Sequence, residues 1–307
     1  MKYLHFTLLT ICIVMASCTI EKTDYGAELG IETTEFIEFN EAITTNSGDY
    51  NISIAALNGT FYKGYNEIRL KITNSNTNEL LENSEITFLP ILTDANGNKS
   101  SSPHQYNLTY NATEGYYSGF AVFTSETSTT ISWQLYINFT DGNKTHAVNE
   151  TIIVEEQTNK NLNITAFTGN DNAQYFIALV APQSPNIGQN NLIAGIYRYN
   201  KPTNVAGVFP DATQFSYSIV DNYTLLLDPR MPEPSMGNHS SPNNQDLTQQ
   251  TNGLYQGVVN YTMTGNWTLN FILKNEQGQT IKGTEVSTAF TPGIVGAKGE
   301  LFIDILF

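Results

Sequence analysis

Cysteine is nearly absent from this chain of 307 residues, which contains only Cys12 and Cys18. No cysteine pair can link later parts of the chain, so the fold has to be stabilised by a hydrophobic core. Long apolar runs are also scarce. The amino-terminal run Tyr3–Ala16 is too short to cross a bilayer as a helix. The patterns GxSxG, Walker A, HExxH and CxxC are missing from the sequence, and no enzyme activity is predicted.

Basic residues are the next deficit. The chain has 14 Lys and Arg against 29 Asp and Glu, which gives a formal charge of −15. Nucleic-acid binding needs clustered Lys and Arg to neutralise phosphates, and here these residues are scattered. Nucleic acid is therefore not expected as a partner.

The amino-terminal stretch MKYLHFTLLTICIVMASC has the features of a bacterial lipoprotein signal peptide. Lys2 supplies a short positive region, an apolar run follows, and the small residues Ala16 and Ser17 precede Cys18. This resembles a lipobox, which implies that residues 1–17 are removed and that Cys18 is diacylated. Two acyl chains suffice for stable membrane anchoring. An ordinary secretory signal with an incidental cysteine is the alternative.

Residues 18–47 are acidic and show no sustained apolar period, which predicts a lipidated tether. Acidic residues soon after the lipidated cysteine resemble the surface-export signals of Bacteroidetes lipoproteins. We therefore expect the protein in the cell envelope, anchored in the outer membrane, on its periplasmic or its surface face. The membrane is the first expected partner.

Beyond the tether, alternating polarity predicts an all-β fold. Ile68, Leu70 and Ile72 alternate with polar residues, and turn-forming residues recur at short intervals. Strands of this kind, with about 100 to 145 residues per unit, are typical of immunoglobulin-like sandwiches.

One pattern occurs twice. The segment GYYSGFAVFT matches GLYQGVVNYT 138 residues later, and WQLYINF from Trp133 matches WTLNFIL from Trp267. The repeat predicts two tandem immunoglobulin-like β-sandwiches, at residues 48–156 and 161–307, with the two tryptophans at equivalent core positions. Residues 155–160 are the expected joint between them.

The three methionines that follow the signal peptide all lie in the second copy. Met231 and Met236 occur with His239 in the proline-rich stretch DPRMPEPSMGNHSSPNN, here called the methionine loop, and Met263 follows one strand later. At the aligned positions the first copy has Leu92, Gly97, Ser100 and Ser125. The two copies therefore share their strand pattern, but only the second carries thioether and imidazole side chains there.

Thioether sulfur is a soft, neutral ligand, and a Met cluster with one His prefers Cu(I) to Ca²⁺ or Mg²⁺. The sequence predicts a copper site of Met231, Met236 and His239, with Met263 as a candidate fourth ligand. The alternative is that Met263 fills the core and that the histidine is solvated. The second copy also gains about fifteen residues between Ile196 and Phe215, expected beside the methionine loop or on an adjoining edge.

The stretch FPDATQFSYSIVDNYTLLLDPRMPEPSMGNHSSPNN, followed by GLYQGVVNYTMTGNW, resembles the FixH/YtkA-like domains of bacterial extracytoplasmic proteins. These carry MP-x-MGH-type loops, a following SPNN and an F/Y-T-M-x-G-x-W strand. The resemblance implies an immunoglobulin-like fold and a role in copper handling or respiratory-oxidase assembly. Its Met and His positions correspond to Met231, Met236, His239 and Met263. Extra residues stretch the MP-x-M segment, and Asn238 separates the glycine from the histidine.

The predicted function is therefore that of a membrane-anchored extracytoplasmic lipoprotein that binds copper for handling, or for delivery to an envelope partner protein. The competing hypothesis is a non-enzymatic cell-surface scaffold that binds a protein or a glycan and no metal. Aromatic residues are plentiful, with 17 Tyr and 16 Phe, but most fall at alternating strand positions where core packing explains them. His104 and His146 lie in expected loops, without an evident nucleophile or partner.

Overall fold

The structure is a computed structural model that describes residues 38–201 and 216–307. The expected signal peptide, the expected lipidation site Cys18 and most of the expected tether fall within residues 1–37, outside the described residues. Residues 202–215 are likewise not described. Within the described ranges, no helix is long and apolar enough to cross a membrane.

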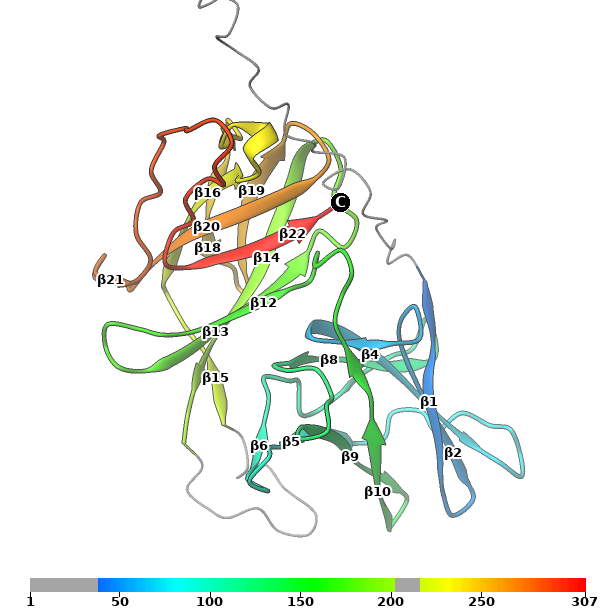
Figure 1. Cartoon of the computed structure of the whole chain (residues 1–307). Coiled ribbons are helices and arrows are strands. Elements are labelled where there is room, and N and C mark those ends of the chain that lie inside the picture. The colour runs from blue at the N-terminus through cyan, green and yellow to red at the C-terminus, as the bar shows by residue number, and fades with distance from the viewer. Residues whose placement is uncertain (1–37, 202–215) are drawn as a thin grey trace, which may run out of the picture. The chain divides into compact units, whose positions relative to one another are not determined.

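The chain folds into β-strands, as the alternating sequence predicts (Figure 1). The first half comprises β1 (Phe39–Ser47), β2 (Tyr50–Leu57), β3 (Phe61–Tyr62), β4 (Gly64–Asn74), β5 (Ile86–Thr93), β6 (Lys99–Ser101), β7 (Thr109–Asn111), β8 (Tyr116–Phe123), β9 (Ser132–Asp141), β10 (Lys144–Ile152) and β11 (Val154–Glu155). The second half comprises β12 (Ile164–Thr168), β13 (Gln174–Ala181), β14 (Gly188–Tyr199), β15 (Tyr217–Ile219), β16 (Thr224–Met231), the 3-10 turn η3 (Pro234–Met236), β17 (His239–Ser240), β18 (Gln245–Gln249), β19 (Tyr255–Tyr261), β20 (Asn266–Lys274), β21 (Thr280–Lys282) and β22 (Phe302–Leu306).

The first half is a β-sandwich. One sheet has the strand order β1-β2-β4-β8-β7, and the other has the order β10-β9-β5-β6. Ile54 and Leu70 of the first sheet share one buried cluster with Phe88, Trp133 and Val148 of the second. The two sheets therefore pack face to face around a common hydrophobic core.

Folded structure begins before residue 48, the expected end of the tether. Strand β1 pairs antiparallel with β2 from Phe39 to Ser47, and Ile43 packs against the core. Glu41 lies on β1 and accepts a hydrogen bond from the Ser53 hydroxyl at 2.7 Å. The strand was missed because it has few apolar residues and a register shift between Glu41 and Ile43, so its alternation is weak.

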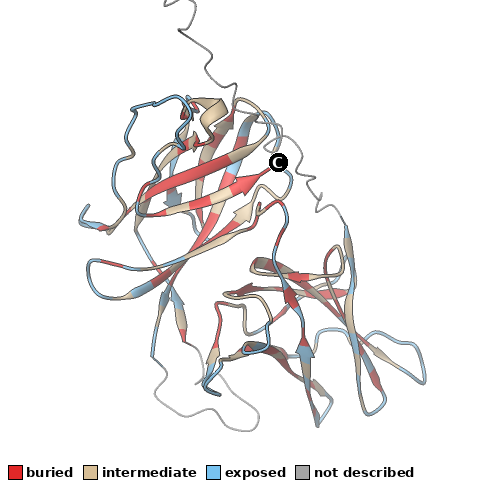
Figure 2. Cartoon of the chain, in the orientation of Figure 1, coloured by how far each residue is buried: buried red, intermediate tan, exposed pale blue. Residues whose placement is uncertain are grey.

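The second half forms one continuous sheet that closes around its own core. Its path runs β12-β13-β14-β19-β18-β16-β20-β21, with β15, β17 and β22 paired at the sides. Strand β18 pairs with both β19 and β16 and so joins two faces that stay separate in the first half. The core includes Tyr175, Tyr255, Trp267, Phe271 and Met231, all buried. Figure 2 shows the buried stretches along the strands of this half.

The two halves share their pairing registers. Phe88 pairs with Ile137 in the first half, and Leu227 pairs with Phe271 in the second. These partners are the residues that align when the two sequence patterns are superposed. The β4–β8 ladder runs from Gly64 and Phe123 to Leu70 and Tyr117, and the β14–β19 ladder runs from Gly188 and Tyr261 to Ala194 and Tyr255.

Both tryptophans are buried and make the same hydrogen bond. The indole nitrogen of Trp133 donates to the Ser125 carbonyl at 2.9 Å, and that of Trp267 donates to the Met263 carbonyl at 3.0 Å. Ser125 and Met263 occupy aligned positions, so the two halves agree in side-chain bonding as well as in backbone pairing.

Two aligned tyrosines repeat a second pattern, in which a hydroxyl donates to one backbone carbonyl and accepts from one backbone N–H. The Tyr117 hydroxyl donates to Leu81 at 2.9 Å and accepts from Ser84 at 2.8 Å. The Tyr255 hydroxyl donates to Val220 at 2.7 Å and accepts from Tyr223 at 3.2 Å. Each tyrosine thereby ties a loop to a strand.

The expected joint between the halves is partly buried, since Gln157 and Asn159 point inward while Glu155, Glu156 and Thr158 are exposed. Gln157 and Asn159 are only 3% and 2% exposed. The Gln157 side chain donates to the Lys63 carbonyl and accepts from the Leu162 N–H, both at 2.9 Å. In sequence this stretch looks like a linker because it is polar. Its buried side chains bond to backbone groups, and composition does not reveal such bonds.

The insertion in the second half falls mostly within residues 202–215, outside the described residues. Its described ends belong to β14 and β15, which pair from Tyr197 and Ile219 to Tyr199 and Tyr217. The other end of β14 pairs with Tyr261, close to Met263 in sequence. The described ends of the insertion therefore lie at the end of β14 opposite the one that pairs with Tyr261. Its expected place, beside the methionine loop or on an adjoining edge, concerns residues that lie outside the described ones.

Candidate functional site

The methionine loop comprises the end of β16, a tight turn at residues 232–238, the short strand β17 and the residues up to Asn244. Pro232 and Pro234 restrict the backbone, and the Met236 N–H donates to the Glu233 carbonyl at 2.9 Å to close the 3-10 turn. Gly237 follows with φ of +64°, a left-handed conformation that glycine adopts without strain. The chain then reverses and re-enters the sheet as β17.

This reversal makes Met231 and His239 cross-strand partners. Such partners lie side by side, with Cβ atoms about 4.5–5.5 Å apart. The first half has Leu92 paired with Ser100 at the same place. The predicted alignment of the two loops is therefore confirmed by pairing, and the second half carries a sulfur and an imidazole where the first carries an alkyl group and a hydroxyl.

The other two methionines pack on the same core. Met231 is 2% exposed and belongs to the buried cluster of the second half. Met236 and Met263 are partly buried and pack against that cluster. All three methionines therefore belong to, or pack against, one core.

His239 contacts this core through its ring. Its Nε2 lies 2.8 Å from the Thr262 hydroxyl, and its ring centroid is 6.2 Å from that of Trp267. When Nε2 carries the proton and donates to the hydroxyl, Nδ1 keeps a lone pair for a metal, an arrangement common among metal-binding histidines. Thr262 is a functional candidate that sequence reasoning missed, although its place directly before Met263 was the available signal.

The donor set suits a soft cation. Three neutral thioethers and one imidazole match the ligand preference of Cu(I). The carboxylates nearest in sequence are Asp228 and Glu233. Asp228 pairs with Arg230 at 2.9 Å, so its charge is largely compensated. Among the described residues, no three His, Cys, Asp or Glu gather in a way that could hold a metal ion, so methionine is the distinctive component of this candidate site.

The stretch SPNN after the loop has a structural role. The Asn244 side chain donates to the Ser241 carbonyl at 2.6 Å and accepts from the Asn260 N–H at 2.9 Å. The Asn260 side chain donates in turn to the Pro242 carbonyl at 3.1 Å. These bonds fasten the end of the methionine loop to β19, the strand that leads to Met263.

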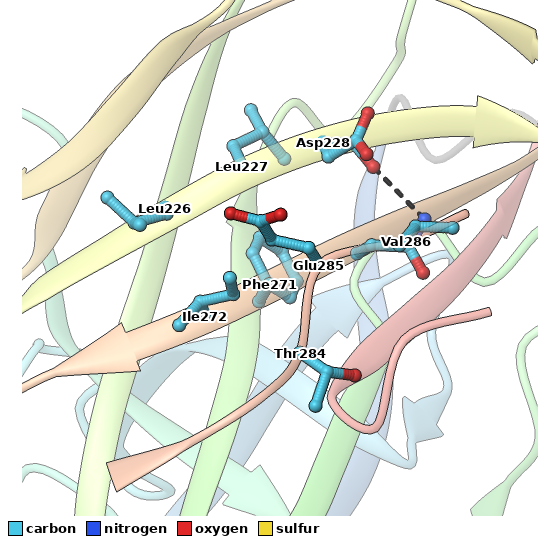
Figure 3. A pocket seen from close by; sticks show the side chains of 9 residues that line it. Leu226, Leu227, Asp228, Phe271, Ile272, Thr284, Glu285 and Val286 are labelled. Atoms are coloured by element: carbon cyan, nitrogen blue, oxygen red, sulfur yellow. Dashed lines mark hydrogen bonds between the residues drawn. The ribbon is translucent and has the colours of Figure 1, made fainter. Parts of the chain in front are cut away.

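A small pocket of 220 Å³ lies near the start of the loop (Figure 3). Strand β16 contributes Leu226 to Asp228, β20 contributes Asn270 to Ile272, and the chain after β21 contributes Thr284 to Val286. Its lining holds apolar side chains and two carboxylates, and none of the predicted ligands.

The remaining described histidines belong to the first half. His146 lies in β10 rather than in the expected loop, with its ring stacked on Phe139 at 4.7 Å. Burial lowers the pKa of His104 to about 4, and the hydrogen bond from its Nδ1 to the Ser102 carbonyl opposes part of this shift. Neither histidine is among the predicted copper ligands.

No protein-family model matches this chain, and no curated protein matches it. Among solved structures, the crystal structure of the conserved domain protein from Bacillus anthracis is similar to it with a TM-score of 0.29 and 12% identity, over 91% of this chain and 94% of that chain. The function therefore has to be argued from the site.

Proposed function

We propose that this protein is a membrane-anchored envelope lipoprotein that binds Cu(I) in its second half. The cross-strand pair of Met231 and His239 carries the proposal, because it places a soft sulfur beside an imidazole. Met236 and Met263 pack against the same core and complete the set. Copper handling, or delivery to an envelope partner, is the role that such a site would serve.

Each ligand has a distinct contribution. The thioethers supply the preference for the reduced ion, and His239 supplies a stronger nitrogen donor. The proline-restricted turn holds Met236 in place before any ion arrives, which lowers the entropy cost of gathering ligands.

The architecture supports this assignment. We infer that the two halves are copies of one immunoglobulin-like sandwich, because their ladders and buried hydrogen bonds coincide. On this view the first copy keeps the frame and the second adds the ligands. The expected lipid at Cys18 would hold both copies at the outer membrane.

A competition titration of Cu(I) against a chromophoric chelator tests the proposal. The whole chain is used with Cys12 and Cys18 replaced by serine, since free thiols bind Cu(I) themselves. The matched variant Met231→Leu/Met236→Gly/His239→Ser copies the first half within the second. We expect one Cu(I) per native chain and no stoichiometric binding by the variant. Equal binding by both chains would refute the site.

A cell-surface scaffold without metal is the second candidate. The observation that favours it is Leu92, which occupies the place of Met231 in the first half and packs against that core. An ordinary apolar residue therefore suffices at this position for packing. Absence of Cu(I) binding by the native chain would return the methionines to this structural role.

A further inference from the structure

The last strand of the sandwich differs between the halves. In the first half, β10 pairs without interruption with β9, from Lys144 to Ile152 opposite Trp133. In the second half the corresponding strand is broken into β21 and β22, and Ile305 of β22 pairs with Trp267. Residues 283–301, here called the cover, leave the sheet between these two pieces.

The two ends of the cover are fixed to the sheet. Gly283 turns the chain with φ of +106°, and a Cβ there would lie 2.2 Å from the Phe271 carbonyl oxygen. On the return, Leu301 accepts a hydrogen bond from the Phe271 N–H at 2.8 Å. Lys282 and Glu300 close the base of the cover with an ion pair at 3.5 Å.

Between these ends, the cover lies against the methionine loop (Figure 1). The Asn238 side chain donates to the Ser287 carbonyl at 3.0 Å, and the Gly296 N–H donates to the Pro232 carbonyl at 2.6 Å. A Cβ on Gly237 would lie 3.4 Å from the Phe290 ring. Three contacts thus link the cover to both sides of Met236.

Side-chain packing contributes little to holding the cover in place. Most of its residues are exposed (Figure 2), and Phe290, Ile294 and Val295 are 49%, 61% and 61% exposed. Residues 286–297 have no charged side chain in a chain of net charge −15, so ion pairs cannot fix this part. Hydrogen bonds, among them those at Asn238 and Gly296 and the one between Asp228 and Val286 (Figure 3), therefore hold the cover on the loop against local opening.

Asn238 and Gly296 also fit each other closely. Asn238 is 6% exposed and adopts φ of +56°, and a Cβ on Gly296 would lie 2.9 Å from its side-chain oxygen. Only glycine allows this approach without displacement. Asn238 is the residue that separates Gly237 from His239 in the sequence, so this latch sits inside the predicted ligand stretch.

We propose that the cover is a positioning element of the methionine loop, latched by Asn238 and Gly296, which slows exchange of an ion held by Met236 and His239. Both the cover and the ligands occur in the second half and are lacking in the described first half, which suggests that they work together. The part that concerns ion exchange rests on the proposed copper function. The positioning part does not.

Amide hydrogen exchange measured by mass spectrometry on the metal-free whole chain tests the latch. Each substitution is made on one side and read on the other: Gly296→Val is read in peptides of residues 232–240, and Asn238→Gly, which keeps the left-handed turn, is read in residues 286–299. We expect about fivefold or faster exchange in both, as loss of a buried hydrogen bond implies. Ala297→Val, at an exposed neighbouring position, is the control and should leave exchange unchanged.

Unchanged exchange across the latch in both variants would overturn the proposal. A second measurement, the rate at which a chelator removes Cu(I), should be at least fivefold faster in Gly296→Val than in Ala297→Val. If no chain binds Cu(I), the copper function fails while the hydrogen-exchange result still decides whether the cover positions the loop. If Cu(I) is bound but leaves all variants at one rate, the cover has no role in ion exchange.

Discussion

Replacing Met231 with leucine separates packing from metal binding at one position. Met231 is 2% exposed, and its methyl carbon lies 2.9 Å from where a Cβ on Gly265 would be. Leucine has a similar volume but does not reach as far, so a small void next to Gly265 is the main cost. Volume-conserving swaps of this kind cost less than about 1.5 kcal/mol, and we expect about 1 kcal/mol here. Leu92, at the same register in the first half, shows that the frame accepts leucine.

Metal binding should respond differently. Leucine has no donor atom, and loss of one thioether should weaken Cu(I) binding by about tenfold or more, which corresponds to about 1.4 kcal/mol. Urea unfolding of the metal-free chain gives the stability term, and chelator competition gives the affinity term. The control Met231→Ala leaves a larger cavity and should lower the free energy of unfolding by about 3 kcal/mol.

Two results would refute this reasoning. If leucine lowers the free energy of unfolding by more than about 2 kcal/mol, the two halves do not share a frame at this position. If leucine leaves Cu(I) affinity unchanged, Met231 is core filler, and the site must do without it.

Three further predictions concern the frame, acid stability and anchoring. Tyr117→Phe and Tyr255→Phe should each lower the free energy of unfolding by a similar amount, about 1–3 kcal/mol in urea titrations, because each leaves equivalent backbone groups without their hydroxyl partner; a large difference would argue against equivalent frames. The folded pKa of His104, about 4, lies below the unfolded value, so the unfolded chain takes up the proton first and stability falls as pH decreases from about 6.5 towards 4. Between pH 6.5 and 5 this loss should be about 1–2 kcal/mol, and a His104→Gln variant with the same acid profile would exclude the histidine as its cause. Cys18→Ser should move the protein from the membrane fraction to the soluble fraction, and an unchanged distribution would contradict the expected lipid anchor.

The sequence predicted the β-fold because alternation was strong where strands are buried on one side. The repeat was visible because Trp133 and Trp267 are large, rare residues in matching surroundings. Strand β1 was not predicted because its alternation of apolar and polar residues is weak. Pairing with β2 stabilises it instead. Such pairing depends on a partner elsewhere in the chain, which local composition does not reveal.

The candidate site was predicted only in part, because residue types are visible in the sequence and contacts to backbone groups are not. Met231 and His239 were named from residue type and from their alignment with Leu92 and Ser100, and the structure adds that the two members of each pair are cross-strand partners. The contact between the cover and the loop could not be predicted, since nearly fifty residues separate Asn238 from Ser287 and the bond uses a backbone carbonyl. Backbone acceptors have no signature in the sequence.

The break between β21 and β22 has a consequence for protein engineering. Strand β10 shows that this edge of the sandwich exists without any added segment, and the second half shows that residues 283–301 fit between two strand pieces that still pair with β20. Segments of other lengths and chemistries could therefore be grafted at Gly283 and Leu301 with the interior ladders kept. The second half thus provides an insertion site at which loops of different sequence can be compared while the strands of the core stay the same.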